Sequence, residues 1–332
     1  MNFFTSSVEQ SFHSVRHFLQ LRGTLNERLL RICRSSTIVA LLLISQFAFA
    51  QQKPENDSIN KKRLNTIIIT ASGLYATTLG VLYFGWYADQ DLTSFHFKDD
   101  SNNWLQVDKA GHATTAYVMS NYGFWTLRWA GVSNNKAAWY GGLMGFGAMT
   151  VIEILDGFVV TYGASWSDLA ANTLGTGIFV SQQLLWKEQR IRMKFSYYPT
   201  DYALCNPSQL GETGLQRMLK DYNGHTYWLS FNIHSFLKKE SRFPAWINVA
   251  VGYGAKGMLH PLNNPPECVN GNPVDYNRVR QYYVSMDIDW TKIKTNSKFL
   301  RFVFKGLSFV KLPFPTLEYN NENHFVFHWM YF

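Results

Sequence analysis

Ionisable and hydrogen-bonding side chains stand at helical spacing inside otherwise apolar stretches of the chain. Asp108 and His112 are four residues apart, and Glu153 and Asp156 are three apart, so each pair lies on one face of a helix. Charged groups are costly in apolar helices, and they usually converge on one another or on a site. The whole set comprises Asp108, Lys109, His112, Glu153, Asp156, Ser167, Asp168 and Asn172.

This set has three interpretations, of which the third is a binding or transport role without catalysis. In the first, the residues form a hydrogen-bonded network that holds helices together, with Lys109 neutralising a carboxylate and Asn172 linking two helices. In the second, His112, Glu153 and Asp168 are catalytic. With Asp156 they could bind a divalent metal that polarises a phosphoryl or acyl group, or they could perform general acid–base catalysis. The sequence contains no HExxH or GxSxG motif, and it identifies neither a metal nor a cofactor.

The segments that carry these residues are predicted to be helices. No proline occurs between residues 66 and 198, and only five charged residues lie between Gly111 and Trp186. The pattern predicts helices over 66–88, 112–130, 137–160 and 168–186, with Ser165 or Ser167 as the N-cap of the last. Gly141, Gly145 and Ala148 have the small-xxx-small spacing that lets helices approach closely.

The second half of the chain has a different pattern. Short aromatic and β-branched segments separated by Gly, Pro and Asn predict strands over 192–198, 226–236, 246–253, 281–289 and 324–332. Residues 298–311 resemble a basic amphipathic helix. The fold class is therefore α+β: an N-terminal four-helix membrane-associated bundle over 66–190, followed by an antiparallel β-rich half over 191–332.

The beginning of the chain has the features of an export signal. Three arginines, at 28, 31 and 34, precede an apolar run over 37–50 that ends in Ala48-Phe49-Ala50. We expect a signal peptide over 1–50, cleaved before Gln51, and a polar linker over 51–65. An uncleaved anchor helix is the alternative.

Composition narrows the possible partners and locations. The net charge is +8, but residues 1–50 contain five arginines and two glutamates, and the remaining basic residues are scattered. Nucleic acid is therefore not an expected partner. Aromatic residues make up 16% of the chain, which suits a membrane interface. If the helices spanned the inner membrane, the basic residues that flank them would lie on its outer side, which is the reverse of the positive-inside rule. We therefore expect the protein at the outer membrane, with the periplasmic face or the inner membrane as alternatives.

Two cysteines remain after the predicted cleavage, Cys205 and Cys268. Both lie in segments rich in proline and asparagine. Thiols in an oxidising compartment often pair, so these residues are candidates for a disulfide.

The ordered motifs also carry a family resemblance. Asp108-Lys109-x-x-His112, Glu153-x-x-Asp156 and Ser167-Asp168-x-x-x-Asn172-x-x-Gly175 resemble the YfiM-type family of predicted periplasmic or lipoprotein-like envelope proteins of unknown function. More distantly, they are similar to the VanZ-like membrane family. The resemblance covers about residues 66–190. This chain lacks the lipobox cysteine of the lipoprotein members, and its strand-rich second half is not a VanZ-like feature.

Two classes of function fit these features. One is a structural, assembly or binding component of the bacterial cell envelope, with a membrane lipid or an envelope protein as its partner. The other is an envelope hydrolase, metal-dependent in one form, that acts on a lipid or cell-wall precursor through His112, Glu153, Asp156 and Asp168.

Overall fold

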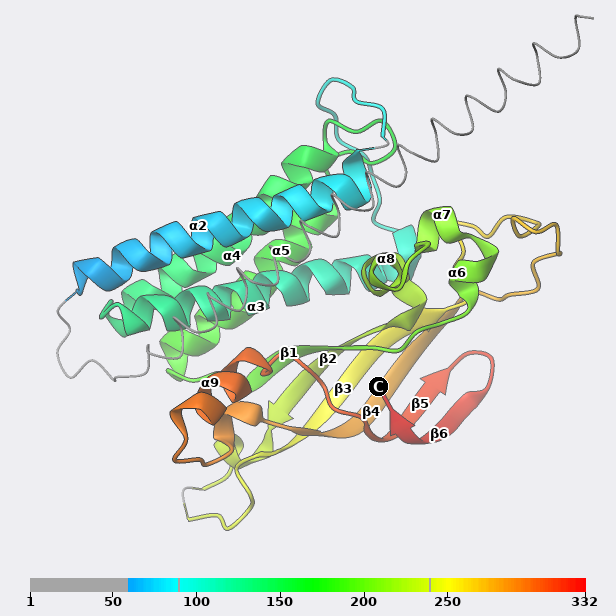
Figure 1. Ribbon diagram of the computed structural model, residues 1–332. Helices are drawn as coiled ribbons and strands as arrows, with labels where there is room; N and C mark the ends of the chain where they lie inside the picture. The colour runs from blue at the N-terminus through cyan, green and yellow to red at the C-terminus, as the bar shows by residue number, and fades with distance from the viewer. Residues whose placement is uncertain (1–58, 89, 239) are drawn as a thin grey trace, which may run out of the picture. The chain divides into compact units, whose positions relative to one another are not determined.

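The computed structural model describes residues 59–88, 90–238 and 240–332 (Figure 1). The predicted signal peptide and residues 51–58 of the predicted linker lie outside these residues. Within the described part, helices fill the first half and an antiparallel sheet fills the second, which confirms the α+β class.

Four long helices form the first half. They are α2 (Lys61–Leu82), α3 (Val107–Trp129), α4 (Asn134–Asp156) and α5 (Trp166–Leu185). Helix α2 begins inside the predicted linker and continues into a π-helical turn, η1 (Tyr83–Tyr87). Helices α3, α4 and α5 pack against one another. Helix α2 lies along this bundle, where the Tyr75 hydroxyl donates to the carbonyl of Ala148 at 2.7 Å.

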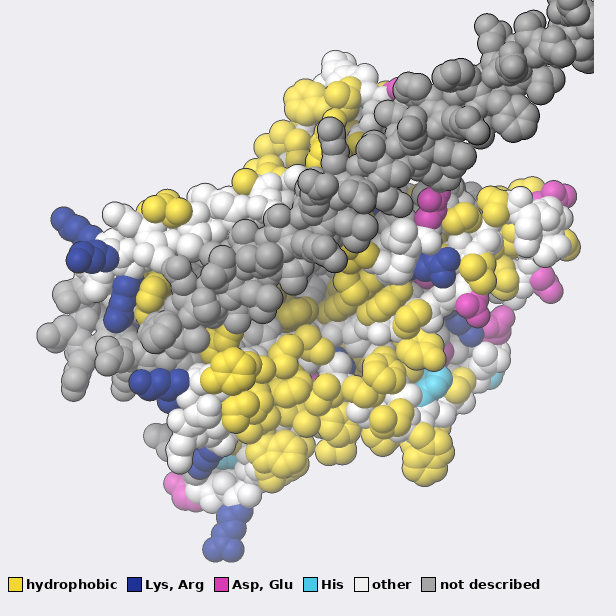
Figure 2. All heavy atoms as spheres, in the orientation of Figure 1, with side chains coloured by type: hydrophobic (Ala, Val, Ile, Leu, Met, Phe, Trp, Pro, Cys, Tyr) yellow, Lys and Arg dark blue, Asp and Glu magenta, His cyan; other side chains and the backbone are white. Residues whose placement is uncertain are grey.

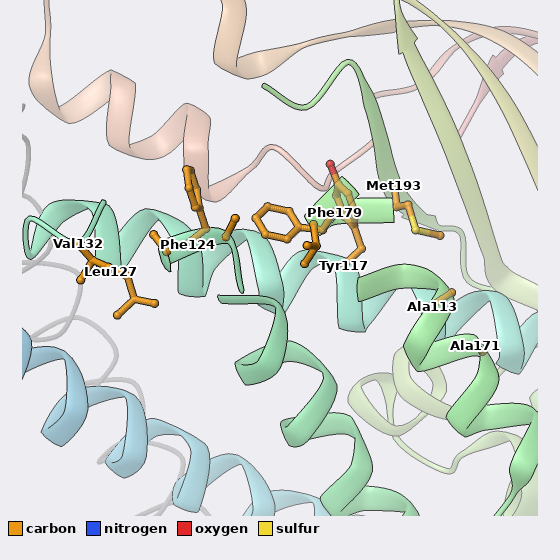
Figure 3. Packing of buried hydrophobic residues seen from close by; sticks show 11 residues of the cluster. Ala113, Tyr117, Phe124, Leu127, Val132, Ala171, Phe179 and Met193 are labelled. Carbon is orange, nitrogen blue, oxygen red and sulfur yellow. The ribbon is translucent and has the colours of Figure 1, made fainter. Parts of the chain in front are cut away.

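Small residues allow α4 and α5 to approach α3 closely. A methyl group at Gly145 would lie 2.5 Å from the carbonyl oxygen of Ala116, and one at Gly141 would lie 2.6 Å from the backbone nitrogen of Phe124. The predicted small-xxx-small seam is therefore a real contact. Figure 3 shows the core along α3, with Phe179 of α5 beside it and Met193 reaching in from the sheet.

Two of the described helices are long and apolar enough to cross a membrane by length and composition alone. Only 6% of the most apolar stretch of α2 is buried, and many of its other residues are half-buried, whereas about a third of the corresponding stretch of α4 is buried. A core helix of a soluble protein passes the same criterion, so this finding alone assigns neither helix to a bilayer.

The second half is one six-stranded antiparallel sheet in which every strand pairs with the next. Its strands are β1 (Ile191–Tyr197), β2 (His225–Asn232), β3 (Ile247–Lys256), β4 (Val279–Ile288), β5 (Phe314–Asn320) and β6 (His324–Tyr331). The sequence did not predict β5. The short helices are α6 (Tyr202–Cys205), α7 (Pro207–Leu210), α8 (Gly214–Lys220), α9 (Lys298–Gly306) and the 3-10 turns η2 (Asn103–Gln106), η3 (Tyr222–Gly224), η4 (Ile233–Phe236) and η5 (Trp290–Lys292).

The predicted helix over 298–311 is shorter in the structure. It ends at Gly306, and the chain then runs beside the free edge of β1. Phe195 donates its backbone N–H to the carbonyl of Phe309 at 2.8 Å and accepts from the N–H of Lys311 at 3.0 Å. Backbone pairing with β1 therefore replaces the last predicted helical turn.

The two faces of the sheet differ sharply in polarity. One row of paired residues is apolar, and the adjacent row is small or polar. The apolar row is Leu229, Val251, Val284, Leu317 and Phe327, and the adjacent row is Ser230, Ala250, Ser285, Thr316 and His328.

The polar face is the buried one. The sheet curls around it, so that the ring of Tyr331 on β6 lies 6.2 Å from that of Trp228 on β2. Two ion pairs are enclosed there: Lys194 with Asp287 at 2.7 Å and Arg192 with Asp289 at 3.3 Å. The helices cover the apolar face over β1 and β2 and leave it exposed over β3 to β6. Figure 2 shows hydrophobic side chains gathered there.

A disulfide joins Cys205 of α6 to Cys268 in the segment between β3 and β4. Cys205 belongs to a second core with Trp104, Val107 and Leu259. This core supports the segment that leads into α3.

The contact between α3 and α5 yields a prediction from one matched pair of glycines. A methyl group at Gly175 would lie 1.9 Å from the carbonyl oxygen of Ala113, whereas one at Gly177 of the same helix would meet nothing within 4 Å. We expect Gly175→Ala to lower the free energy of unfolding by about 1–3 kcal/mol or more. Gly177→Ala should leave it unchanged or raise it by about 1 kcal/mol. Urea denaturation measures both, and equal stabilities would contradict this helix contact.

Candidate functional site

The ends of three helices bring all eight sequence-predicted residues together. Asp108, Lys109 and His112 come from the start of α3, and Glu153 and Asp156 come from the end of α4. Ser167, Asp168 and Asn172 come from the start of α5. We call these eight residues, together with Asp100 and Ser165, the charged cluster.

Lys109 lies at the centre of this cluster. Its Nζ is 2.6 Å from Asp100, 3.0 Å from Asp108 and 2.9 Å from Asp168. Burial acts to lower the pKa of Lys109, but the carboxylates of Asp108 and Asp168 outweigh it and raise that pKa. The ammonium group therefore stays charged and links α3, α5 and the loop before η2.

Two members of the site were missed by the sequence analysis. Asp100 accepts hydrogen bonds from the hydroxyls of Ser165 and Ser167, the latter at 2.8 Å. Tyr87 donates to Asp156 Oδ1 at 2.6 Å. Asp100 lies in a loop and Tyr87 at the end of a π-helical turn, so neither has a helical spacing to the other members.

The sheet half orients the first turn of α3. Trp104, Leu105 and Gln106 have left-handed backbone angles, with φ of 49°, 50° and 66°, which are costly for residues other than glycine. Contacts from the β-rich half hold this turn. The N–H of Trp104 donates to the carbonyl of Pro261 at 2.8 Å, and Arg280 donates to the side chain of Gln106 at 2.6 Å.

Ser165 is the N-cap that orients the start of α5. Its Oγ accepts from the N–H of Asp168 at 3.2 Å. Its own N–H donates to Glu153 Oε2 at 3.1 Å. Of the two predicted caps, Ser165 holds the position, and Ser167 lies inside the helix.

His112 stands between two carboxylates. Its Nδ1 is 3.4 Å from Glu153 Oε1, and its Nε2 is 3.7 Å from Asp168 Oδ1. Asn172 Oδ1 lies 3.3 Å from the same Nδ1. Glu153 Oε1 is buried and has no hydrogen-bond partner among the described residues. The imidazole is therefore hydrogen-bonded to Asn172, and the two carboxylates lie near its nitrogens without hydrogen-bonding to them.

Burial decides the protonation of these groups. It raises the pKa of Glu153 to about 8, a shift that nearby Asp168 increases, and it raises the pKa of Asp108 to about 7. Burial also lowers the pKa of His112. Near neutral pH, Glu153 is therefore largely a neutral acid beside a neutral imidazole.

The remaining carboxyls differ in the same environment. Burial raises the pKa of Asp156 to about 6 and also raises that of Asp168. Burial acts in the same direction on Asp100, but the hydrogen bonds from Lys109 and Ser165 outweigh it and lower its pKa to about 2. Asp100 is thus the firmly ionised partner of Lys109.

Two groups of side chains have the composition of a metal site. One is His112, Glu153 and Asp168, and the other is Asp100, Asp108 and Asp168. In the second group, Lys109 already contacts all three carboxylates. In the first group, one nitrogen of His112 and one oxygen from each of Glu153 and Asp168 lie within 4.8 Å of one another. The first group therefore has the spacing of a metal site, whereas the second is occupied by the ammonium group of Lys109.

Solvent reaches the cluster at one side. The side chains of Asp100 and His112 are each 18% exposed, whereas that of Glu153 is 3% exposed. His112 is therefore more accessible to solvent than Glu153.

The raised pKa of Glu153 predicts how stability varies with pH. Its folded pKa of about 8 lies above the ordinary value of 4.5. Between these values the folded state holds a proton that the unfolded state has lost, so stability is highest below the lower value and falls as pH rises toward 8. The slope is at most about 1.4 kcal/mol per pH unit for one group.

Glu153→Gln removes this titration, so the decline of stability from about pH 5 to about pH 8 should become shallower. Asp108 and Asp156 act in the same direction, so some decline should remain. Glu212→Gln, a change at an exposed residue, is the control and should leave the profile unchanged. Urea denaturation across this range is the measurement, and parallel curves for Glu153→Gln and the unmodified chain would rule out this role for burial.

Comparison with known proteins gives one result for this region. Residues 95–183 match the model of a family described as "Predicted periplasmic lipoprotein (DUF2279)". The match contains every member of the charged cluster and none of the sheet. No curated protein and no solved structure shows significant similarity to the chain. Over about a quarter of its length, the chain is thus similar to an envelope family of uncharacterised function, which supports an exported location.

Proposed function

We propose that this chain is a cell-envelope protein that binds a membrane lipid surface through the apolar face of its sheet. The observation that carries the proposal is the inverted polarity of the sheet, with paired charges inside and exposed hydrophobic residues outside. Soluble sheets bury their apolar face, whereas strands that contact lipid alternate apolar-out and polar-in.

The exposed part of this face extends over four strands. On β6 the side chains of Phe325, Phe327 and Trp329 are 69%, 55% and 79% exposed. Val249, Val251, Tyr282, Val284, Met286, Leu317 and Tyr319 continue the surface across β3 to β5. A continuous apolar surface of this extent is unusual on a soluble monomer and marks a protein or membrane contact. We favour lipid as the partner because the exposed apolar side chains form one surface across four strands.

Helix α9 supports a lipid partner. It places Lys298, Arg301 and Lys305 among Phe299, Leu300 and Phe302, and Phe299 is exposed. Basic amphipathic helices of this kind lie at the surface of anionic membranes. Among bacterial membranes we favour the outer one, because the sequence predicts an export signal and its basic flanks do not suit the inner membrane.

Membrane contact can be tested on β6. The triple variant Phe325→Ser, Phe327→Ser and Trp329→Ser removes exposed apolar area, so it should bind phospholipid vesicles at least about tenfold more weakly. Vesicle co-flotation of the purified chain measures this binding.

A matched control replaces three exposed hydrophobic residues outside this face, Leu204, Leu262 and Val269, with serine. It should bind as the unmodified chain does. Equal binding by both triple variants would refute lipid contact through the sheet.

Acid–base catalysis is the second candidate function. It is favoured by the position of His112 between two carboxylates and by its access to solvent. In this form, neutral His112 accepts a proton from water or from a substrate hydroxyl, and Asp168 stabilises the resulting imidazolium. Asp156 accepts a hydrogen bond from Tyr87, and its charge adds to burial and to Asp168 in raising the pKa of Glu153. The reaction class would be hydrolysis of an envelope lipid or precursor.

Two variants in a deletion strain separate this candidate from a purely structural cluster. If His112 is catalytic, His112→Gln should lose the phenotype while the protein still folds and reaches the same membrane fraction. If the cluster is structural, His112→Ala should lower the stability by about 1–3 kcal/mol, because buried partners lose their hydrogen bonds. Full complementation by the double variant of His112→Gln and Glu153→Gln would exclude the catalytic role.

A further inference from the structure

A basic cavity lies at the opposite end of the helical bundle from the charged cluster. Its volume is about 290 Å³, and it is lined by the last turns of α3 and α5, the start of β1, η5 and α9. Asn121 and Trp125 of α3 line it, whereas His112 belongs to the other end of that helix. Nine residues separate Asn121 from His112, which corresponds to roughly 14 Å along a helix. The two sites are therefore distinct.

Cations outnumber anions around this cavity. Four basic residues line it, Lys187, Arg192, Lys292 and Lys305, against one acid, Glu188. Lys292 pairs with Glu188 at 2.8 Å, and Arg192 pairs with Asp289 at 3.3 Å. Lys187 and Lys305 have no ion-pair partner among the described residues. Two lysines without an ion-pair partner among the described residues thus line the cavity, Lys187 at an exposed position and Lys305 over the ring of Trp125.

A buried amide points to a missing partner at the same place. Asn121 is 4% exposed and lines the cavity. Its side chain makes no hydrogen bond with any residue in the described part of the chain. The neighbouring amides are paired, since Gln183 donates to Asn134 Oδ1 at 3.0 Å. The Asn121 amide is therefore available to hydrogen-bond with a ligand in the cavity.

Two contacts beside the cavity hold α9 against α3. Lys305 lies 5.7 Å from the ring centre of Trp125, and the Tyr122 hydroxyl donates to the carbonyl of Gly306 at 2.6 Å. These contacts attach the end of α9 to α3. Phe299, at the other end of the same short helix, is exposed.

We propose that this cavity binds a phosphate group through Lys187, Lys305 and Asn121. Two unpaired ammonium groups provide charge-assisted hydrogen bonds to phosphate oxygens, and the Asn121 amide provides a neutral donor. The volume is at the lower end of small-molecule pockets, which suits a headgroup rather than a large cofactor. The phosphate could belong to a phospholipid headgroup or to a soluble phosphate compound. Only the lipid source rests on the proposed membrane function.

The binding experiment uses the purified full chain and two probes, inorganic phosphate and a short-chain phosphatidylglycerol below its micelle concentration. Isothermal titration calorimetry should detect binding of at least one probe. Lys187→Gln with Lys305→Gln should weaken that binding by about tenfold or more. The control pair, Lys62→Gln with Lys238→Gln, removes the same charge at exposed positions and should bind as the unmodified chain does.

The outcomes separate the alternatives. Tighter binding of the short-chain lipid than of phosphate identifies a headgroup, and equal binding identifies a soluble phosphate. Asn121→Ala should weaken either probe without adding charge, and circular dichroism checks that it folds. Absence of binding by both probes would overturn the proposal. An equal loss of probe binding in the control pair would also overturn it, and so would binding of acetate as tight as that of phosphate. Vesicle binding that persists without binding of either probe would leave the proposed membrane function intact.

Discussion

The ion pairs of Lys109 are the interaction on which the helical half depends. One ammonium group joins carboxylates from the loop before α3, from α3 itself and from α5. Desolvation of these charges is costly, and only close, well-directed contacts offset it. Such contacts require the helix backbones to approach closely, which glycines such as Gly175 permit. The packing of the helices and the ion pairs of Lys109 therefore depend on each other. A bulkier residue between the helices would move Lys109 away from its carboxylates. Loss of the Lys109 ammonium group would leave these carboxylates repelling one another.

The sequence predicts those parts of the molecule whose residues follow a regular spacing. The helices and eight cluster residues share the helical period, and their motifs keep one order along the chain, so they could be found. Asp100 and Tyr87 reach the cluster from irregular segments, and no periodicity connects them to it. Strand β5 was missed because it contains Pro315. The structure places that proline at a register irregularity between Phe314 and Thr316, where a missing N–H is tolerated. Helix α9 was overextended because backbone pairing of residues 309–311 with β1 overrides their helical pattern.

The molecule separates opposite charges along its length. An excess of carboxyl groups collects where α3 and α5 begin, and unpaired ammonium groups collect where these helices end. The sheet separates its residues in a different way, with polar groups on its buried face and apolar groups on its exposed face. It encloses the Lys194–Asp287 and Arg192–Asp289 ion pairs, and it holds the ammonium group of Lys311 by hydrogen bonds and the ring of Trp228, so its charges do not interrupt the apolar exterior. The two candidate sites consequently differ in the ligands they suit: the carboxyl-rich end exchanges protons, and the basic end attracts anions.

The Cys205–Cys268 bridge connects the chemistry of the cluster to the redox state of its surroundings. The bridge belongs to the core that contains Trp104 and Val107, the residues that lead into Asp108 and Lys109. A thiol pair needs an oxidant to close, and the cytosol keeps thiols reduced. A chain still awaiting export therefore lacks the covalent support of the turn that aims Lys109 at its three carboxylates. Formation of the disulfide that supports the site therefore requires an oxidising compartment. A chain that stays in the cytosol keeps both thiols reduced and lacks this support.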